Sequence, residues 1–406
     1  MRKILRFSVL GLAVVGAGVG GTVGYSTWAW GRSVDVASPP IQADRAPEAV
    51  ARGAAIFHST CEVCHRGAGS ERASGAPMTD PPAFMGTFYT ANLTADRVAG
   101  IGSLDDAAIA RTIRYGVDRH GHRIPMPSYG MGDADVAAVL GFLRSNDPLF
   151  APDATVAPRT DLSALGKTVI VLTGGATIPA RPSRGIPVPE RAPTVTYGRY
   201  LAHEVYDCAG CHTPGFGVNK TESAELFEGG FEFRDPSGQP SFSKNLTPDA
   251  TGIAHYERSD MARALRKGVR PDGTVLSAPM PMFRGLTDVD IDALYIYLRS
   301  LPARRNEGPG RTPPQTVRSV STPDPATRFR SLGCIGCHGP AAAHASALAR
   351  ASDKPTPEVA RWIRNPERTI PGTPMPTYAD LIDEEGALAL AEWIKSGGVQ
   401  KLAAAP

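Results

Sequence analysis

The sequence predicts an all-α protein in which three small helical units follow one N-terminal transmembrane helix. Three observations favour this fold class. Cys-x-x-Cys-His occurs three times and uses all six cysteines of the 406-residue chain. Apolar residues recur at helical spacing in the segments that close the units, as at Val136, Val139, Leu140 and Leu143. Residues 7–31 carry no charge, and such a run is long enough to cross a bilayer as a helix.

The composition fits a globular protein built from several small domains. The chain is too long for one ordinary domain, and it is 42% hydrophobic and 20% charged. Its 43 glycines and 37 prolines indicate long loops and linkers between the helices. A net charge of +3 is too close to balance for a nucleic-acid-binding protein, so we expect no nucleic-acid partner.

The N-terminus has the charge pattern of an exported chain. Arg2 and Lys3 precede the uncharged run, which places the first residues in the cytoplasm and the rest outside. Trp28 and Trp30 lie at the far end, where interfacial aromatic residues belong. No convincing cleavage site follows, which favours an uncleaved anchor over residues 1–32, with a cleaved signal peptide as the alternative. Both alternatives predict the periplasmic side of a bacterial inner membrane.

An internal repeat divides the rest of the chain into three units. The first unit spans residues 46–150, the second spans 193–303 and the third spans 325–402. The stretches between them, 151–192 and 304–324, are rich in proline and are expected to be extended, semi-rigid linkers. Each unit contains one Cys-x-x-Cys-His motif near its start.

The first two units share further segments in the same order. Each has Asn-Leu-Thr-x-Asp, a Gly-Ile pair, an amphipathic helix, a Gly-Val turn and a closing helix. The helices are expected at residues 105–115 and 133–144 in the first unit, and at 259–267 and 288–299 in the second. The third unit lacks Asn-Leu-Thr-x-Asp and closes with a helix expected at 383–395. Residues 167–173, in the first linker, could form a short strand.

Cys-x-x-Cys-His is the attachment motif of c-type haem. Two thiols three positions apart on one helical turn reach the two vinyl groups of a porphyrin, and the adjacent His points its imidazole at the iron. A thioredoxin-type redox pair would need a βαβ context, and a zinc site would need paired Cys knuckles close in sequence. We therefore expect three covalently bound haem c groups. The predicted attachment thiols are Cys61, Cys64, Cys208, Cys211, Cys334 and Cys337, and the predicted proximal iron ligands are His65, His212 and His338.

A methionine is the predicted sixth iron ligand in each unit. A Met-Pro dipeptide precedes the closing helix three times, with the methionine at Met126, Met280 and Met375. Met and His together raise the reduction potential and favour electron transfer over oxygen chemistry. Met282, two residues after Met280, is the rival ligand in the second unit.

The remaining methionines and histidines are interpreted as structural. Met131 aligns with a leucine of the second unit and is expected to fill the core, while Met78 and Met85 are expected to pack in a loop. The histidines outside the motifs recur at no single place in the repeat, so a surface or hydrogen-bonding role is expected for each. They are His58, His120, His122, His203, His255 and His344.

These features specify the fold class as three tandem class I-like cytochrome c domains after one N-terminal transmembrane helix. The first two units, over residues 46–303, resemble the multihaem cytochrome c subunits of membrane-bound bacterial dehydrogenases, of the alcohol, gluconate and aldehyde dehydrogenase type. The resemblance implies that a dehydrogenase catalytic subunit supplies electrons, which then pass to quinone or a terminal oxidase. The third unit differs, because its Trp-Ile-x-Asn-Pro and Pro-Gly-Thr-x-Met-Pro segments look like small monohaem cytochrome c domains of respiratory chains.

The predicted function is therefore electron transfer, with no catalytic residue in this chain. No nucleophile–base pair, phosphate-binding loop or dinucleotide fingerprint is present. The alternatives are an electron conduit in another respiratory or photosynthetic complex and a multihaem peroxidase. A peroxidase would need one haem with an open or displaceable ligand position. Whether the chain counts as an enzyme by itself stays open, because the catalytic group would belong to a partner.

Overall fold

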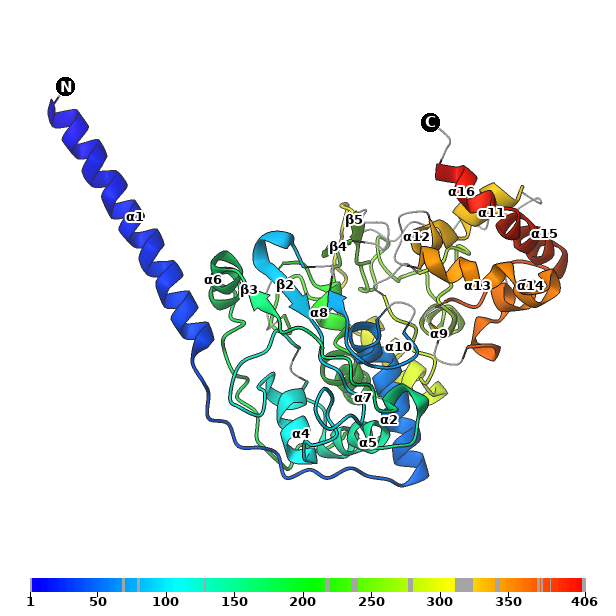
Figure 1. Ribbon diagram of the computed structural model, residues 1–406, viewed down its shortest axis with the longest axis horizontal. Coiled ribbons are helices and arrows are strands. Elements are labelled where there is room, and N and C mark those ends of the chain that lie inside the picture. Colours follow the sequence, from blue (N-terminus) through cyan, green and yellow to red (C-terminus); the bar gives the residue numbers. More distant parts are fainter. Residues whose placement is uncertain are drawn as a thin grey trace.

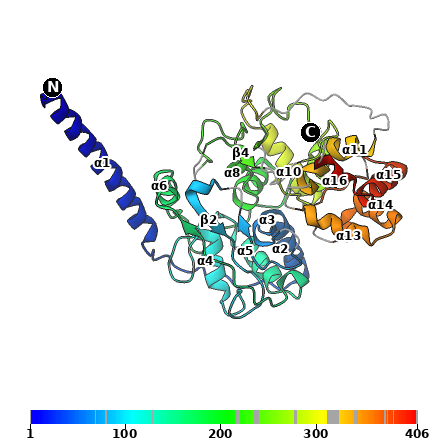
Figure 2. The same ribbon diagram turned by 45° about the horizontal axis from the view of Figure 1, so that its top comes forward.

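The computed structural model describes residues 2–67, 70–78, 81–127, 129–215, 220–234, 240–276, 280–310, 324–339, 344–370, 373, 375–379 and 381–403. Helix α1 (Arg2–Gly31) projects away from the folded body at one end, and the third unit lies at the other end (Figures 1 and 2). The first and second units form the central part of the body between them.

The first unit and the linker after it contain helices and short strands. In chain order they are α2 (Pro47–Thr60), α3 (Glu62–His65), β1 (Pro77–Met78), the 3-10 turn η1 (Ala83–Met85), β2 (Gly86–Tyr89), α4 (Asp106–Tyr115), α5 (Asp133–Leu143), the 3-10 turn η2 (Pro148–Phe150), β3 (Asp161–Leu162) and α6 (Ala164–Leu172).

The second unit repeats this plan. It contains α7 (Val195–Tyr200), the π-helical turn η3 (Leu201–Val205), α8 (Cys208–His212), β4 (Glu232–Arg234), β5 (Pro240–Phe242), α9 (Arg258–Lys267) and α10 (Asp288–Arg299). The third unit contains α11 (Pro325–Ser331), α12 (Cys334–His338), η4 (Ala345–Leu348), α13 (Ala349–Ser352), α14 (Thr356–Arg364), η5 (Pro366–Arg368), α15 (Glu384–Lys395) and α16 (Gly398–Ala403).

The helices predicted from apolar spacing are confirmed within one residue at each end. Their starts have the side-chain caps that their sequences suggest. Asp105 accepts from the backbone N–H of Ala108, and Asp383 accepts from that of Gly386. The Gly-Val turns also match, because Gly116 and Gly268 end α4 and α9 in the left-handed conformation, with φ of 63° and 71°.

In each of the first two units the opening helix crosses the closing helix at a glycine. A Cβ at Gly53 of α2 would lie 2.0 Å from the carbonyl oxygen of Ala138 in α5. A Cβ at Gly198 of α7 would lie 2.0 Å from that of Ala293 in α10. The backbones therefore approach so closely that only glycine fits at the crossing. This contact fixes the position of the Cys-x-x-Cys-His motif, which follows the opening helix.

The prediction of an all-α fold is wrong, since two small antiparallel sheets are present. β1, β2 and β3 form one sheet in that order, and β4 pairs with β5 in the other. β3 belongs to the first linker, where Asp161 pairs with Thr87. The linker thus folds back on the first unit over part of its length. The short strand considered for residues 167–173 is also wrong, because α6 (Ala164–Leu172) covers that segment as a helix capped by Ser163.

The predicted transmembrane helix is not supported. Within the described residues, no helix combines the length and the hydropathy needed to cross a membrane. The physical reason is composition: the second half of α1 contains several glycines that add little hydropathy, at positions 16, 18, 20, 21 and 24.

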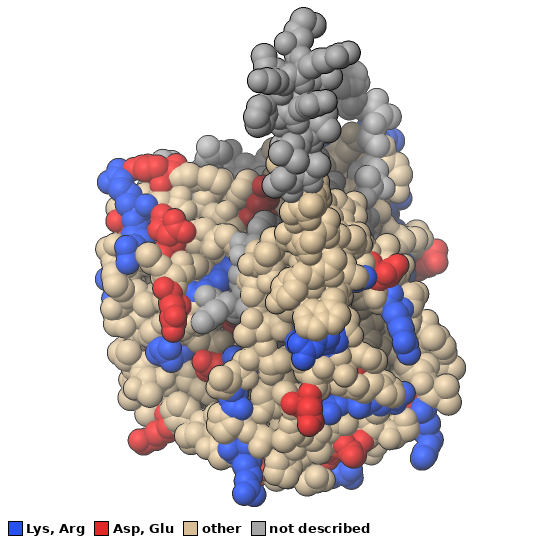
Figure 3. Space-filling model, turned by 90° about the vertical axis from the view of Figure 1, so that its left-hand side faces the viewer, with Lys and Arg blue, Asp and Glu red and all other residues tan. Residues whose placement is uncertain are grey.

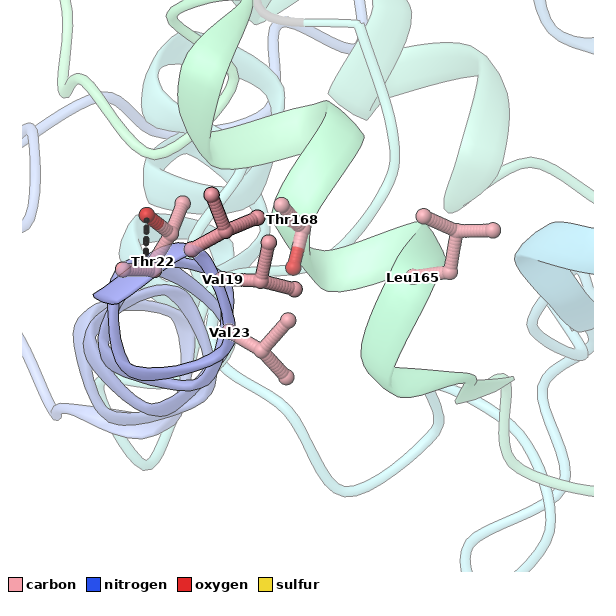
Figure 4. A pocket seen from close by; sticks show the side chains of 7 residues that line it. Val19, Thr22, Val23, Leu165 and Thr168 are labelled. Atoms are coloured by element: carbon pink, nitrogen blue, oxygen red, sulfur yellow. Dashed lines mark hydrogen bonds between the residues drawn. The ribbon is translucent and has the colours of Figure 1, made fainter. Parts of the chain in front are cut away.

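The second half of α1 lies against α6 of the linker. Val19 and Val23 of α1 face Leu165 and Thr168 of α6 across a shallow, mainly apolar pocket (Figure 4). On the face of the molecule that carries α1, Lys and Arg side chains are interspersed with Asp and Glu (Figure 3). Among the residues described on this face, no extended patch of one charge is visible.

The first and second units share one continuous hydrophobic core. Phe57 and Leu140 of the first unit and Tyr197 and Leu294 of the second belong to the same cluster of buried side chains. The third unit has a separate core around α11, α14 and α15, and Val275 of the second unit packs against it.

A buried charge cluster joins the first two units. Arg52 of α2 places Nε 3.1 Å from the Asp135 carboxylate and Nη1 3.6 Å from the Asp290 carboxylate. These aspartates occupy the same position in α5 and α10. Tyr200 donates to Asp135 at 2.8 Å, and Tyr197 donates to Asp290 at 2.7 Å. Because both carboxylates are almost fully buried, loss of Arg52 would remove a counter-charge that they share, although Asp135 also pairs with the more exposed Arg191 at 3.1 Å.

We expect Gly53→Ala to destabilise the chain by about 3 kcal/mol, because the new methyl group would force α2 and α5 apart. Gly24→Ala in α1 is the matched control, since nothing lies within 4 Å of its Cβ position. Denaturant unfolding followed by circular dichroism measures both. Equal stability of the two variants would contradict the helix crossing described here.

Candidate haem sites

Each Cys-x-x-Cys-His motif lies on a single helical turn at the end of the opening helix. Cys61 caps α3, which ends at His65, while α8 and α12 run from the first Cys of their motifs to the His. All six cysteines are thiols rather than disulfides. Burial raises the pKa of Cys61, Cys208 and Cys334 to about 12, so these side chains are protonated at neutral pH. These cysteines would hold an attached haem through thioether bonds.

The motif histidines are held in the same way in all three units. The Nδ1 atom of His65 lies 2.8 Å from the carbonyl oxygen of Ala91, and that of His212 lies 2.6 Å from the carbonyl of Lys244. The Nδ1 atom of His338 lies 3.1 Å from the carbonyl of His344. A carbonyl only accepts, so Nδ1 carries the hydrogen and the lone pair is on Nε2.

Burial also favours the neutral imidazole that an iron ligand requires. It lowers the pKa of His65 and His338, and it lowers the pKa of His212 to about 4. The backbone hydrogen bond at Nδ1 opposes this shift in each case without cancelling it. Two thiols and an oriented neutral imidazole fit a c-type haem with His as its proximal ligand.

The Asn-Leu-Thr segments position the carbonyl groups that orient two of these histidines. Ala91 and Lys244 directly precede Asn92 and Asn245. Asn92 accepts hydrogen bonds from the backbone N–H and hydroxyl of Thr94 at 2.8 and 2.7 Å. Asn245 accepts the equivalent pair from the threonine two residues on, at 2.9 and 2.8 Å. Such a turn fixes the direction of the chain just after the carbonyl.

Both asparagines are also anchored to the chain that leaves their unit. Asn92 donates to the carbonyl of Asp153 at 2.8 Å, and Asn245 donates to that of Arg304 at 2.7 Å. The exposed fraction of the two side chains is 3% and 0%. The sequence repeat identified the Asn-Leu-Thr segments but did not predict what they do. Their role, which is to orient the proximal histidine, depends on a backbone atom that residue identity does not reveal.

The predicted methionine ligands lie on partly buried loops. Met126 and Met280 pack against the core shared by the first two units, and Met375 packs against the core of the third. The rival Met282 is engaged elsewhere, because its sulfur lies 3.4 Å from Nη2 of Arg284. Met131 is buried in the core as expected, with 1% of its surface exposed.

His58, His120, His122 and His203 have hydrogen-bonding or surface roles of the expected kind. The His58 ring lies 2.6 Å from the Glu62 carboxylate, and the His203 ring lies 2.5 Å from the hydroxyl of Tyr297. His120 is exposed. The side chain of His122 is exposed. Both His122 and His255 lie outside the three Cys-x-x-Cys-His turns. His344 contributes its backbone carbonyl to His338, and the two rings are 6.3 Å apart.

Tyr129 lies between the motifs of the first and second units. It is 8% exposed, and burial raises the pKa of its hydroxyl well above the ordinary value. Cys61 of the first motif and Cys211 of the second both lie within electrostatic range of this hydroxyl. The two motifs are therefore close enough to act on one side chain.

Two segments of the chain match known domain families. Residues 48–143 match the family model of cytochrome c oxidase, cbb3-type, subunit III, and residues 198–302 match that of cytochrome c. These segments fall within the first and second units. The prediction of three class I-like cytochrome c domains is thus corrected to two matched domains. The third unit differs physically, because it lacks the Asn-Leu-Thr-x-Asp turn and has α13 and α14 before its methionine loop.

Relatives of the chain include cytochrome subunits of dehydrogenases. It is similar to the fructose dehydrogenase cytochrome subunit of Gluconobacter japonicus, with 32% identity over 41% of this chain and 30% of the relative. It is similar to the gluconate 2-dehydrogenase cytochrome c subunit of Pantoea cypripedii, with 28% identity over 60% of this chain and 57% of the relative. It is 39% identical to the cytochrome c subunit of the quinone alcohol dehydrogenase of Gluconobacter oxydans, over 25% of this chain and 20% of the relative.

The aligned region spans between 20% and 57% of the length of these relatives. The matched domains imply covalently bound haem c at the first and second motifs. The chain is also similar to cytochrome subunits of dehydrogenases over part of their length.

We expect Asn245→Ala to shift the reduction potential of the haem on the second motif and leave that of the first unchanged, because only the Lys244 carbonyl loses its support. The cost in stability should be about 2–3 kcal/mol, since buried partners lose their hydrogen bonds. Asn92→Ala is the reciprocal control and should shift the first haem alone. Potentiometric titration with optical detection distinguishes the two, and a shift of both haems by either variant would contradict this role.

Proposed function

We propose that the chain is a triheme electron-transfer subunit that accepts electrons from a dehydrogenase catalytic subunit. The observation that carries this proposal is the same imidazole arrangement at three separate Cys-x-x-Cys-His turns, with Nδ1 directed at a backbone carbonyl. The likeness to cytochrome subunits of fructose, gluconate and alcohol dehydrogenases supports the dehydrogenase partner.

The proposed iron ligands are His65 with Met126, His212 with Met280, and His338 with Met375. Bound haem c would supply one-electron oxidation and reduction at its iron. The chain holds the proximal imidazoles neutral and oriented, and it supplies a thioether sulfur from a proline-stiffened loop. A methionine and a histidine together would leave no open position at the iron, which suits electron transfer.

The proposed location is the periplasmic side of a bacterial inner membrane. Basic residues at the start of the chain, followed by an uncharged run, support export. Quinone or a terminal oxidase is the proposed electron acceptor.

A second candidate is an electron conduit attached to a terminal oxidase. The match of residues 48–143 to a family named for an oxidase subunit favours it. A multihaem peroxidase has less support, because each unit offers a methionine for the position that a peroxidase must leave open.

Purification of the chain from its native membranes in mild detergent tests the partner. We expect a flavin, quinoprotein or molybdenum dehydrogenase to co-purify in a fixed ratio, because an electron-accepting subunit must dock close to its donor. A terminal oxidase in its place would support the second candidate, and the chain alone would contradict both.

We expect Met280→Leu to remove the low-spin methionine-ligated signature of one haem and to lower its reduction potential, because leucine keeps the volume but offers no sulfur. Met282→Leu is the matched control and should leave both properties unchanged. Optical and electron paramagnetic resonance spectra of the oxidised protein measure this. The opposite pattern would assign the ligand to Met282.

A further inference from the structure

Arg284 has no counterpart in the first unit. Tyr129 and Phe283 occupy the same place in the repeat, because each donates its backbone N–H to the amphipathic helix, Tyr129 to Ile113 at 2.9 Å and Phe283 to Leu265 at 2.8 Å. After this point the first unit continues directly with Gly130, whereas the second unit has Arg284 before the matching glycine. The second unit therefore carries one inserted, charged residue beside its methionine loop.

The inserted arginine reaches into the third unit. Nη2 of Arg284 donates to the carbonyl oxygen of Met375 at 2.8 Å, and Nη1 donates to the carbonyl oxygen of Thr373. Nη1 also lies 3.0 Å from the carboxylate of Glu367, just after α14. Within its own unit, Arg284 contacts the sulfur of Met282. One guanidinium thus connects the methionine loops of the second and third units.

The chemistry of the third loop explains why such a donor is needed there. Its sequence is Thr-Pro-Met-Pro, and the two prolines have no N–H to offer to neighbouring carbonyls. The planar guanidinium presents several donors in a fixed geometry, so it can hold both carbonyl groups at once. Its side chain is 22% exposed, and burial lowers its pKa while the charges of Glu367 and Glu62 oppose that shift. Partial burial makes these bonds stronger than the same contacts in water.

Apolar contacts continue the junction on both sides of Arg284. Val275, in the turn that follows α9, packs against the core of the third unit. A Cβ at Gly268 would lie 3.3 Å from the sulfur of Met282 and 3.6 Å from Pro376. Met282 of the second unit and Pro376 of the third therefore both approach Gly268.

We propose that Arg284 is a positioning residue for the third haem site, which clamps the Met375 loop onto the second unit and so holds the Met375 sulfur in place as an iron ligand. This inference rests on the proposed function for the part that concerns a haem on the third motif. The clamp itself is a property of the chain and does not require the haem.

The test compares Arg284→Ala with Arg284→Lys in the full-length holoprotein. Hydrogen exchange of the segment 366–382 reports the clamp, and the spectrum and potential of the third haem report ligation by Met375. Arg284→Ala should speed exchange in this segment by about tenfold, because two charge-assisted hydrogen bonds are lost. It should also lower the reduction potential of the third haem and decrease the methionine-ligated fraction of its spectrum. The spectrum and potential of the first haem should not change. Arg284→Lys should restore only part of the protection from exchange and part of the haem signal. An ammonium group cannot donate to both carbonyls in the fixed geometry of a guanidinium.

Arg299→Ala is the matched control, because this exposed arginine of α10 donates to the carbonyl of Ala254 within its own unit. It removes the same charge and should alter neither readout. Glu367→Gln, a substitution at a 41% exposed side chain, keeps the test decisive if the Arg284 variants fold poorly. It should give a smaller increase in exchange of the same segment.

Unchanged exchange and an unchanged third haem in Arg284→Ala or Glu367→Gln would overturn the inference. Equal effects of Arg299→Ala would also overturn it, because a general charge effect would then suffice. If the wild-type chain binds no haem at the third motif, the proposed triheme function fails, while the exchange data still decide whether Arg284 clamps the loop.

Discussion

The structure depends on the bond between each proximal imidazole and a backbone carbonyl. A histidine next to a Cys pair can rotate, and it can be protonated or present either nitrogen. The carbonyl removes these alternatives, since it fixes the hydrogen on Nδ1 and leaves the lone pair on Nε2. Much of the loop structure in the first two units serves to hold that carbonyl, through a buried asparagine that is tied in turn to the end of the unit. A small unit with few aromatic residues can in this way build a rigid site without a thick core.

The three units are not equally independent of one another. The first and second are fused through a common core, a buried arginine between two aspartates, and close backbone approach, as where a Cβ at Gly285 would meet Ala55 at 2.4 Å. The third keeps its own core and meets the second at a smaller junction around Arg284 and Val275. Rigid fusion suits two redox sites that must stay at a fixed separation. Because this junction is small, the placement of the third unit depends more on single residues such as Arg284.

The sequence predicted the helices well because their signals are local. Apolar spacing and acidic caps such as Asp105 and Asp383 fixed their bounds to within a residue. The prediction was wrong where contacts between distant segments determine the secondary structure. β3 forms because the linker returns to β2, and α6 is helical although its apolar run also resembles a strand. The transmembrane helix was inferred from the absence of charge, whereas hydropathy depends on the glycines that replace apolar side chains in α1. The asparagine role and the Arg284 junction could not be read from sequence, because both act on backbone carbonyls of distant segments.

The measurement that tests the account most directly is the mass of the intact, denatured chain purified from its native host. Covalent attachment survives unfolding, so each haem c adds a fixed mass to the polypeptide. The account predicts three haems on every chain, one for each oriented imidazole. A mass that corresponds to two haems would contradict it.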